Sequence, residues 1–112
     1  MSEMFEARLF MLQRASAMLL APLVLVHLVL MFYAVHGGLS ADEILARTRG
    51  NMLWAVFYGA FVVAVALHAP IGLRNLLREW TGLGSGAVNA LSLAFGLLLL
   101  LLGARAVIGV VA

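Results

Sequence analysis

The sequence predicts an all-α membrane protein with three transmembrane helices, organised as a single domain over residues 1–112. Its composition points to this class, since 65% of the residues are hydrophobic, only 11% are charged, and the mean hydropathy is +1.12. A soluble domain of this size could not keep so much apolar surface from water. The distribution of the charged residues then places the helices.

Three long stretches of the chain contain no Asp, Glu, Lys or Arg, namely residues 15–41, 50–73 and 80–104. Each stretch exceeds the ~20 residues that a helix needs to cross a hydrocarbon core of ~30 Å. The first is also longer than the apolar part of a secretory signal, so we interpret it as a retained span. We therefore expect transmembrane helices over about residues 15–35, 52–74 and 87–107.

The positions of the seven arginines predict the orientation, because loops that carry more arginine tend to stay in the cytoplasm. Arg8 and Arg14 precede the first span, and Arg74 and Arg78 follow the second, so these four lie on one side. The other three are expected on the opposite side, namely Arg47, Arg49 and Arg105. We predict a cytoplasmic N-terminus and a C-terminus outside.

The connection between the first two spans, residues 36–51, contains a helix-start signal. Ser40 is followed three residues later by Glu43, which is the pattern of a capping box. We expect a short helix that begins there and continues to about Thr48. For the connection as a whole we favour a solvated connector over a functional element.

Composition also excludes several kinds of function. Cysteine is absent, which rules out thiolate iron–sulfur ligation, disulfides and covalently attached haem on this chain. The net charge is only +2 and no basic stripe is present, so nucleic acid is not an expected partner. Little polar chain lies outside the spans, so we expect no catalysis by this chain alone and assign the chemistry largely to its partners.

One histidine, His68, lies inside the second span. An ionisable side chain at membrane depth is costly and usually functional, and imidazole is a common ligand of haem iron. Ala64 and Gly72 lie one helical turn to either side, so we expect a flat strip on which a porphyrin could rest. We predict that His68 is an axial haem ligand; the alternative is a histidine that hydrogen-bonds between helices.

Arg14 and Arg74 are predicted at the same cytoplasmic membrane edge, near enough to the depth of His68 to reach the propionates of a haem bound there. Haem carries two propionates that seek such an edge and a positive charge, so we predict that both arginines bind them. The alternative is that arginines at this edge extend to lipid phosphates and fix the topology. That alternative explains Arg74 less well, because it lies only six residues after His68.

Two further features predict how the helices pack. Pro70 removes a backbone hydrogen bond to Ala66, and we expect this to open a cavity near the end of the second span. Small and polar residues recur along the third span and suit close contact with another helix. They are Ser85, Asn89, Ser92, Gly96 and Gly103.

A second histidine, His27, lies deeper in the membrane than His68. At 1.5 Å per residue it is ~20 Å beyond Arg14, whereas His68 is about 9 Å from Arg74. Their different depths exclude joint ligation of one iron within this chain. We interpret His27 as a packing histidine and leave open a second, outer haem completed by a partner helix.

These motifs together resemble the small membrane-anchor subunits of succinate dehydrogenase and fumarate reductase, which have three transmembrane helices and a cytoplasmic N-terminus. Their first helix opens with an Arg-Ala-Ser/Thr-Ala-like sequence, here residues 14–17, and their haem histidine is followed by a glycine and an Asp-Tyr pair, here His68, Gly72 and Glu79-Trp80. Residues 72–75, Gly-Leu-Arg-Asn, also resemble a Gly-Ile-Arg-His of the companion anchor. Which of the two anchors this chain represents stays open.

The resemblance implies haem b as cofactor and quinone as electron acceptor. His68 matches the axial haem ligand, and Arg14 matches an arginine near the propionates. Glu79 and Trp80 match the Asp-Tyr pair beside the quinone, although an indole N–H replaces the tyrosine hydroxyl. Ser16 is a further local candidate for contact with the quinone.

The resemblance also implies partners. A flavoprotein would oxidise succinate to fumarate, as in the tricarboxylic acid cycle, and an iron–sulfur protein would pass the electrons to the membrane. A second anchor, or a second copy of this chain, would complete the haem and quinone sites in the lipid of a bacterial inner membrane. Two alternatives remain: a haem-free structural anchor, and a cytochrome b subunit of another membrane dehydrogenase.

Overall fold

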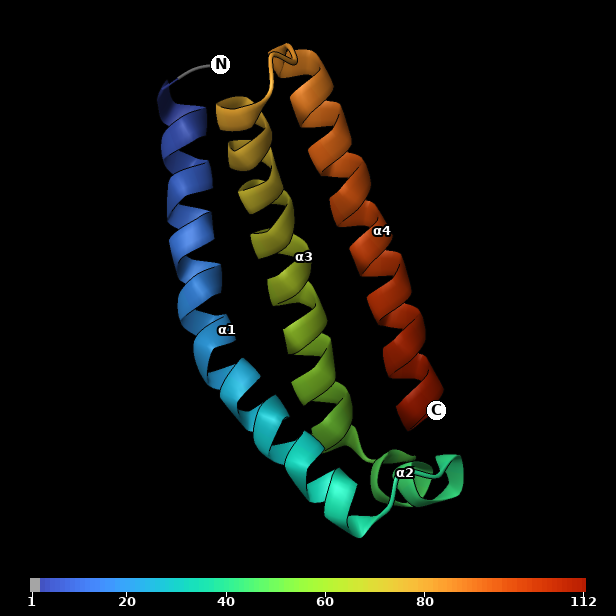
Figure 1. Cartoon of the computed structure of the whole chain (residues 1–112). Coiled ribbons are helices and arrows are strands. Elements are labelled where there is room, and N and C mark those ends of the chain that lie inside the picture. Colours follow the sequence, from blue (N-terminus) through green and yellow to red (C-terminus); the bar gives the residue numbers. More distant parts are fainter. Residues whose placement is uncertain (1–2) are drawn as a thin grey trace.

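The computed structural model describes residues 3–112, which form four helices (Figure 1). Three of them are long and apolar enough to cross a membrane, namely α1 (Glu3–Gly37), α3 (Met52–Trp80) and α4 (Ser85–Val111). The fourth, α2 (Ala41–Thr48), is short. The structure confirms the all-α class with three candidate spans.

The long helix α3 lies between the other two, and α1 and α4 pack mainly on α3 (Figure 1). The start of α1 lies at the same end of the bundle as the α3–α4 connection, and the C-terminus lies near α2 at the other end. Arg8 and Arg78 are therefore at the same end of the bundle, as the arginine pattern requires. Which end faces the cytoplasm stays a prediction.

Each long helix continues beyond the predicted span, because no helix breaker stands at the membrane edge. Helix α1 already begins at Glu3, and α3 continues past Arg74 to Trp80. It ends where Thr81 adopts an extended conformation and its hydroxyl donates to the carbonyl of Leu77 at 2.6 Å. The charged residues thus sit on regular helix and hold defined positions relative to the apolar spans.

Two prolines lie within the helices and have different surroundings. Helix α1 bends in its middle part (Figure 1), near Pro22, which lacks the N–H that would bond to the carbonyl of Met18. Helix α3 runs through Pro70 without interruption. A Cβ added to Gly96 of α4 would lie 2.8 Å from Cγ of Pro70, so α4 approaches α3 closely at that point.

The small-residue face of α4 lies against α3, as the sequence predicts. Val88 and Ser92 are buried there, and a Cβ on Gly103 would clash with the side chain of Val62. Ser85 at the start of the helix is exposed. Lipid supplies no hydrophobic force that drives helices together, so close van der Waals packing has to hold them in contact. Small side chains make that packing possible because they let the two backbones approach each other.

Most of the connection between α1 and α3 is exposed, as expected for a solvated connector, but it also contacts the end of α4. Its short helix begins as predicted, with the Ser40 hydroxyl accepting from the backbone N–H of Glu43 at 3.1 Å. The hydroxyl of the buried Thr48 then donates to the backbone carbonyl of Val110 at 2.5 Å. The backbone N–H of Gly50 donates to the backbone carbonyl of Val111 at 2.7 Å. The connection thereby satisfies carbonyls that the end of α4 would otherwise leave unpaired.

Candidate functional site

His68 lies at the contact between α3 and α1, where its Nδ1 is 3.3 Å from the hydroxyl oxygen of Ser16. Ser16 is buried, and its hydroxyl donates to the backbone carbonyl of Gln13 at 3.0 Å. A hydroxyl has one proton, so with that proton on the Gln13 carbonyl Ser16 accepts from Nδ1–H, which is the tautomer in which Nε2 of the imidazole keeps a lone pair. No hydrogen-bond partner of Nε2 is found among residues 3–112.

The flat strip beside His68 is covered by α1, so the expectation that a porphyrin could rest on it was wrong. Ala64 is only 1% exposed. At Gly72 the missing side chain leaves room for the amide of Gln13, whose nitrogen lies 3.6 Å from the position of an added Cβ. The small residues therefore let α1 pack closely on α3.

His68 could serve as one axial ligand of a haem, but its surroundings in this chain supply no further part of a haem pocket. His68 is half-buried, and it lines none of three cavities of about 690, 270 and 330 Å³ found in the described part of the chain. Residues 3–112 contain no cluster of three His, Asp or Glu side chains that could hold a bare metal ion. Haem needs only axial imidazoles, so His68 fits this role if another chain supplies the rest of the pocket.

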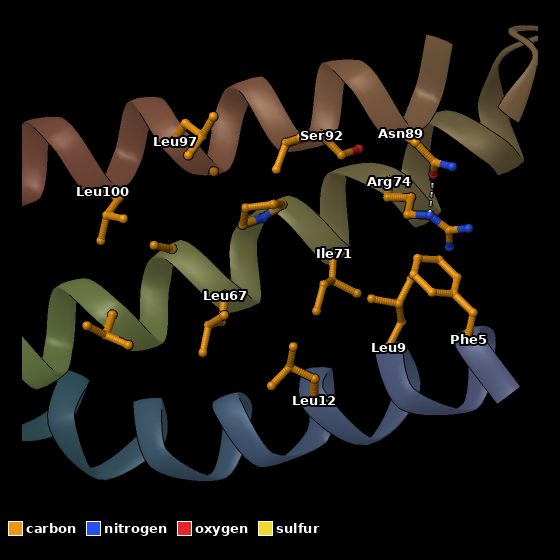
Figure 2. Close-up of a pocket in the computed structure, with 15 residues that line it drawn as sticks. Phe5, Leu9, Leu12, Leu67, Ile71, Arg74, Asn89, Ser92, Leu97 and Leu100 are labelled. Atoms are coloured by element: carbon orange, nitrogen blue, oxygen red, sulfur yellow. Dashed lines mark hydrogen bonds between the residues drawn. The ribbon is translucent and has the colours of Figure 1, made fainter. Parts of the chain in front are cut away.

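Arg74 is buried and connects all three long helices, and Figure 2 shows its bond to Asn89 on α4. Its guanidinium donates to both carboxylate oxygens of Glu6 on α1, at 2.7 and 3.2 Å, and to the amide oxygen of Asn89 on α4 at 2.8 Å. Arg78 donates to the same carboxylate at 3.0 Å. The predicted role of Arg74 at a propionate stays a prediction, and its observed partners are Glu6 and Asn89.

Arg14, the other predicted propionate ligand, is exposed. Its guanidinium lies 5.6 Å from the centre of the Phe10 ring, and it forms no ion pair within residues 3–112. It stands about 200° around α1 from Ser16, which faces α3. Its charge is thus available on a surface of α1 that turns away from α3.

The structure does not bring the predicted quinone ligands together. Glu79 and Trp80 are exposed at the end of α3, where Trp80 is 79% exposed, and neither lines a described cavity. Ser16 is enclosed between α1 and α3 beside His68. A cavity of about 690 Å³ does lie beside Pro70, as predicted, but it extends along α1, α3 and α4.

His27 packs against aromatic rings, at 5.3 Å from the centre of Phe61 and 6.4 Å from that of Tyr58. Its Nδ1 is buried without a partner in the described chain, and the residue lines a cavity of about 270 Å³. It stands eleven residues beyond Ser16, or about 16 Å along α1. The ring contacts agree with a packing role, and the different depth agrees with the exclusion of one shared iron.

A comparison with protein families gives a match over nearly the whole chain. The family described as succinate dehydrogenase/fumarate reductase transmembrane subunit matches residues 1–110. The chain belongs to this family. No curated protein and no solved structure matches it. The resemblance inferred from the motifs around Ser16 and His68 is thereby confirmed.

Family membership makes the chain a membrane subunit of succinate dehydrogenase or fumarate reductase, with soluble subunits as partners. Its three apolar helices make it a multi-pass membrane protein. The carboxylate that pairs with Arg74 in this subunit was not predicted from the sequence. Glu6 precedes the first span on the same side as Arg74 and Arg78, and an acidic residue opposite two arginines was the available signal.

Proposed function

We propose that this transmembrane subunit binds haem b through Nε2 of His68 and forms part of the site at which quinone accepts electrons. The observation that carries the haem assignment is the hydrogen bond between Nδ1 and Ser16. Histidines that ligate metals commonly donate their second ring N–H to a fixed acceptor, which sets the tautomer and the ring orientation. A bound haem would supply one-electron transfer.

In this proposal Ser16 is a positioning residue for the haem ligand. Its own proton is engaged by the Gln13 carbonyl, so its oxygen presents a lone pair to Nδ1–H. The second axial ligand and the remaining wall of the haem pocket come from a second anchor or a second copy of this chain. The exposed Arg14 supports a propionate role, whereas Arg74 would have to share its charge with Glu6.

We place the quinone contacts at the end of α3, where Glu79 and Trp80 are exposed. An indole N–H donates to a quinone carbonyl, and a carboxylate transfers protons during reduction. The iron–sulfur subunit would cover both residues, and the flavoprotein would oxidise succinate at a distance. Ser16 keeps its predicted quinone contact only if the α1–α3 interface opens.

Purification of the whole complex in mild detergent tests the proposal. We expect a flavoprotein and an iron–sulfur protein to co-purify with this chain from a bacterial inner membrane. The complex should show b-type haem absorbance and reduce quinone with succinate. Co-purification without any b-type bands would refute the haem assignment and favour a structural anchor, and a different dehydrogenase in the preparation would refute the assignment to succinate.

Replacing Trp80 separates the quinone site from the flavin. Trp80→Leu should lower succinate:quinone activity by at least about tenfold, the effect of one lost hydrogen bond to the quinone, while succinate oxidation with a soluble dye is unchanged. Trp80→Phe keeps the ring and removes the N–H, so it should be impaired as well. Trp54→Leu, the same change at the other end of α3, is the control. Equal losses with dye and quinone would indicate failed assembly instead.

The haem content of the complex tests the packing interpretation of His27. We expect about one haem per flavin, because of the two histidines at membrane depth only His68 has a hydrogen-bonded Nδ1, whereas Nδ1 of His27 has no partner among residues 3–112. His27→Leu should keep this ratio, since the ring contacts with Phe61 and Tyr58 are largely apolar. A ratio near two that falls to one in His27→Leu would show that an outer haem exists.

A further inference from the structure

The cavity of about 690 Å³ is a groove between α1 and α4 with α3 as its floor (Figure 2). Aliphatic side chains line most of it, and its polar groups gather at one end, where Arg74 and Asn89 lie. From Asn89 to Leu100 the groove follows about 16 Å of α4.

One polar side chain in the groove has no partner. Ser92 is 5% exposed, and its hydroxyl oxygen is buried without a hydrogen bond within the described residues. It is one of the groove-lining residues. A buried hydroxyl normally finds a partner, because leaving it unpaired costs the full desolvation of the group. An alkyl chain alone would leave it unpaired, so the occupant should carry an acceptor at this depth.

The polar end of the groove has an excess of positive charge. Arg74 and Arg78 share the single carboxylate of Glu6, which leaves one positive charge uncompensated among the three. Arg74 uses three of its five N–H groups in the observed hydrogen bonds. An anionic head group at this end would therefore meet both charge and unused donors.

We propose that this groove binds an anionic phospholipid of the surrounding membrane. The phosphate lies at Arg74 and Arg78, and an ester carbonyl accepts from Ser92, which is about 4.5 Å further along α4 than Asn89. The acyl chain then follows α4 past Gly96 to Leu100, about 12 Å beyond Ser92. Phosphate, ester and chain thus occur in the order in which the groove presents cation, hydroxyl and aliphatic wall.

A pair of neighbouring leucines gives a matched test. Leu97 lines the groove and Leu98 does not, although their exposed fractions are 53% and 52%. The purified complex, stripped of lipid by detergent exchange, is titrated with phosphatidylglycerol and observed by native mass spectrometry. Leu97→Trp should abolish the tightest bound phosphatidylglycerol, and Leu98→Trp should retain it. Equal binding by both variants, or equal loss in both, overturns the proposal.

Two further variants test the polar contacts. Ser92→Ala should weaken phosphatidylglycerol binding about fivefold, the effect of one hydrogen bond. Arg78→Gln should remove the preference for phosphatidylglycerol over phosphatidylcholine, which has the same esters and no net charge. If wild-type complex binds the two lipids equally, or if added ubiquinone displaces phosphatidylglycerol from it, the groove is not an anionic-lipid site.

Discussion

The His68→Leu complex should assemble and lack the low-spin haem spectrum. Leucine has no lone pair for iron, and it removes the imidazole that Ser16 holds in place at 3.3 Å. Iron that loses an axial imidazole no longer has the strong-field pair of ligands that gives a b-type spectrum. Absorbance of the dithionite-reduced complex, scaled to its flavin content, measures the effect, and we expect most of the b-type signal to disappear.

Two other variants show whether this loss belongs to the ligand. His36→Leu makes the same change at an exposed histidine that bonds to the Phe32 carbonyl, and it should keep the spectrum. Ser16→Ala leaves the iron ligand and removes its acceptor, so it should keep haem but shift the midpoint potential. A normal spectrum in an intact His68→Leu complex contradicts ligation by this residue, and an unchanged potential in Ser16→Ala contradicts the positioning role.

Arg74→Leu should lower the apparent melting temperature of the complex by several degrees. The guanidinium is 5% exposed and joins Glu6 on α1 to Asn89 on α4. Removing it leaves the carboxylate with Arg78 alone and takes a charged partner from the amide oxygen of Asn89. Glu6 and Arg78 are partly exposed, with side-chain exposures of 35% and 49%, so solvent compensates part of the lost interactions and the destabilisation is moderate. Differential scanning fluorimetry in detergent measures the shift.

Arg14→Leu distinguishes this structural role from propionate binding. Arg14 has no ion pair within residues 3–112, so its loss should leave the melting temperature unchanged. If it binds a propionate, haem retention should fall or the midpoint potential should shift, since an uncompensated carboxylate near hydrocarbon is costly. Unchanged haem content and potential in both Arg14→Leu and Arg74→Leu would show that neither arginine serves the propionates.

The sequence by itself determined the helices and the histidine of interest. Charge-free stretches longer than the bilayer core predict spans whatever their neighbours are, and all three were found. The capping box at Ser40 predicts α2 for an equally local reason, since its hydrogen bond spans three residues. His68 stands out because a titratable side chain in an apolar segment needs an explanation. Such signals depend on the chain alone.

Only the tertiary structure decided what these residues touch. These contacts depend on the rotation of each helix about its own axis. They are the pair of Ser16 and His68, the pair of Glu6 and Arg74, the cover of α1 over Ala64, and the groove at Ser92. In a soluble protein an apolar stripe reveals that rotation. A membrane helix is apolar on every side, because lipid accepts the same side chains as the interior does. The faces of α1, α3 and α4 are therefore set by close packing at residues such as Gly96, which no periodicity of hydrophobicity encodes.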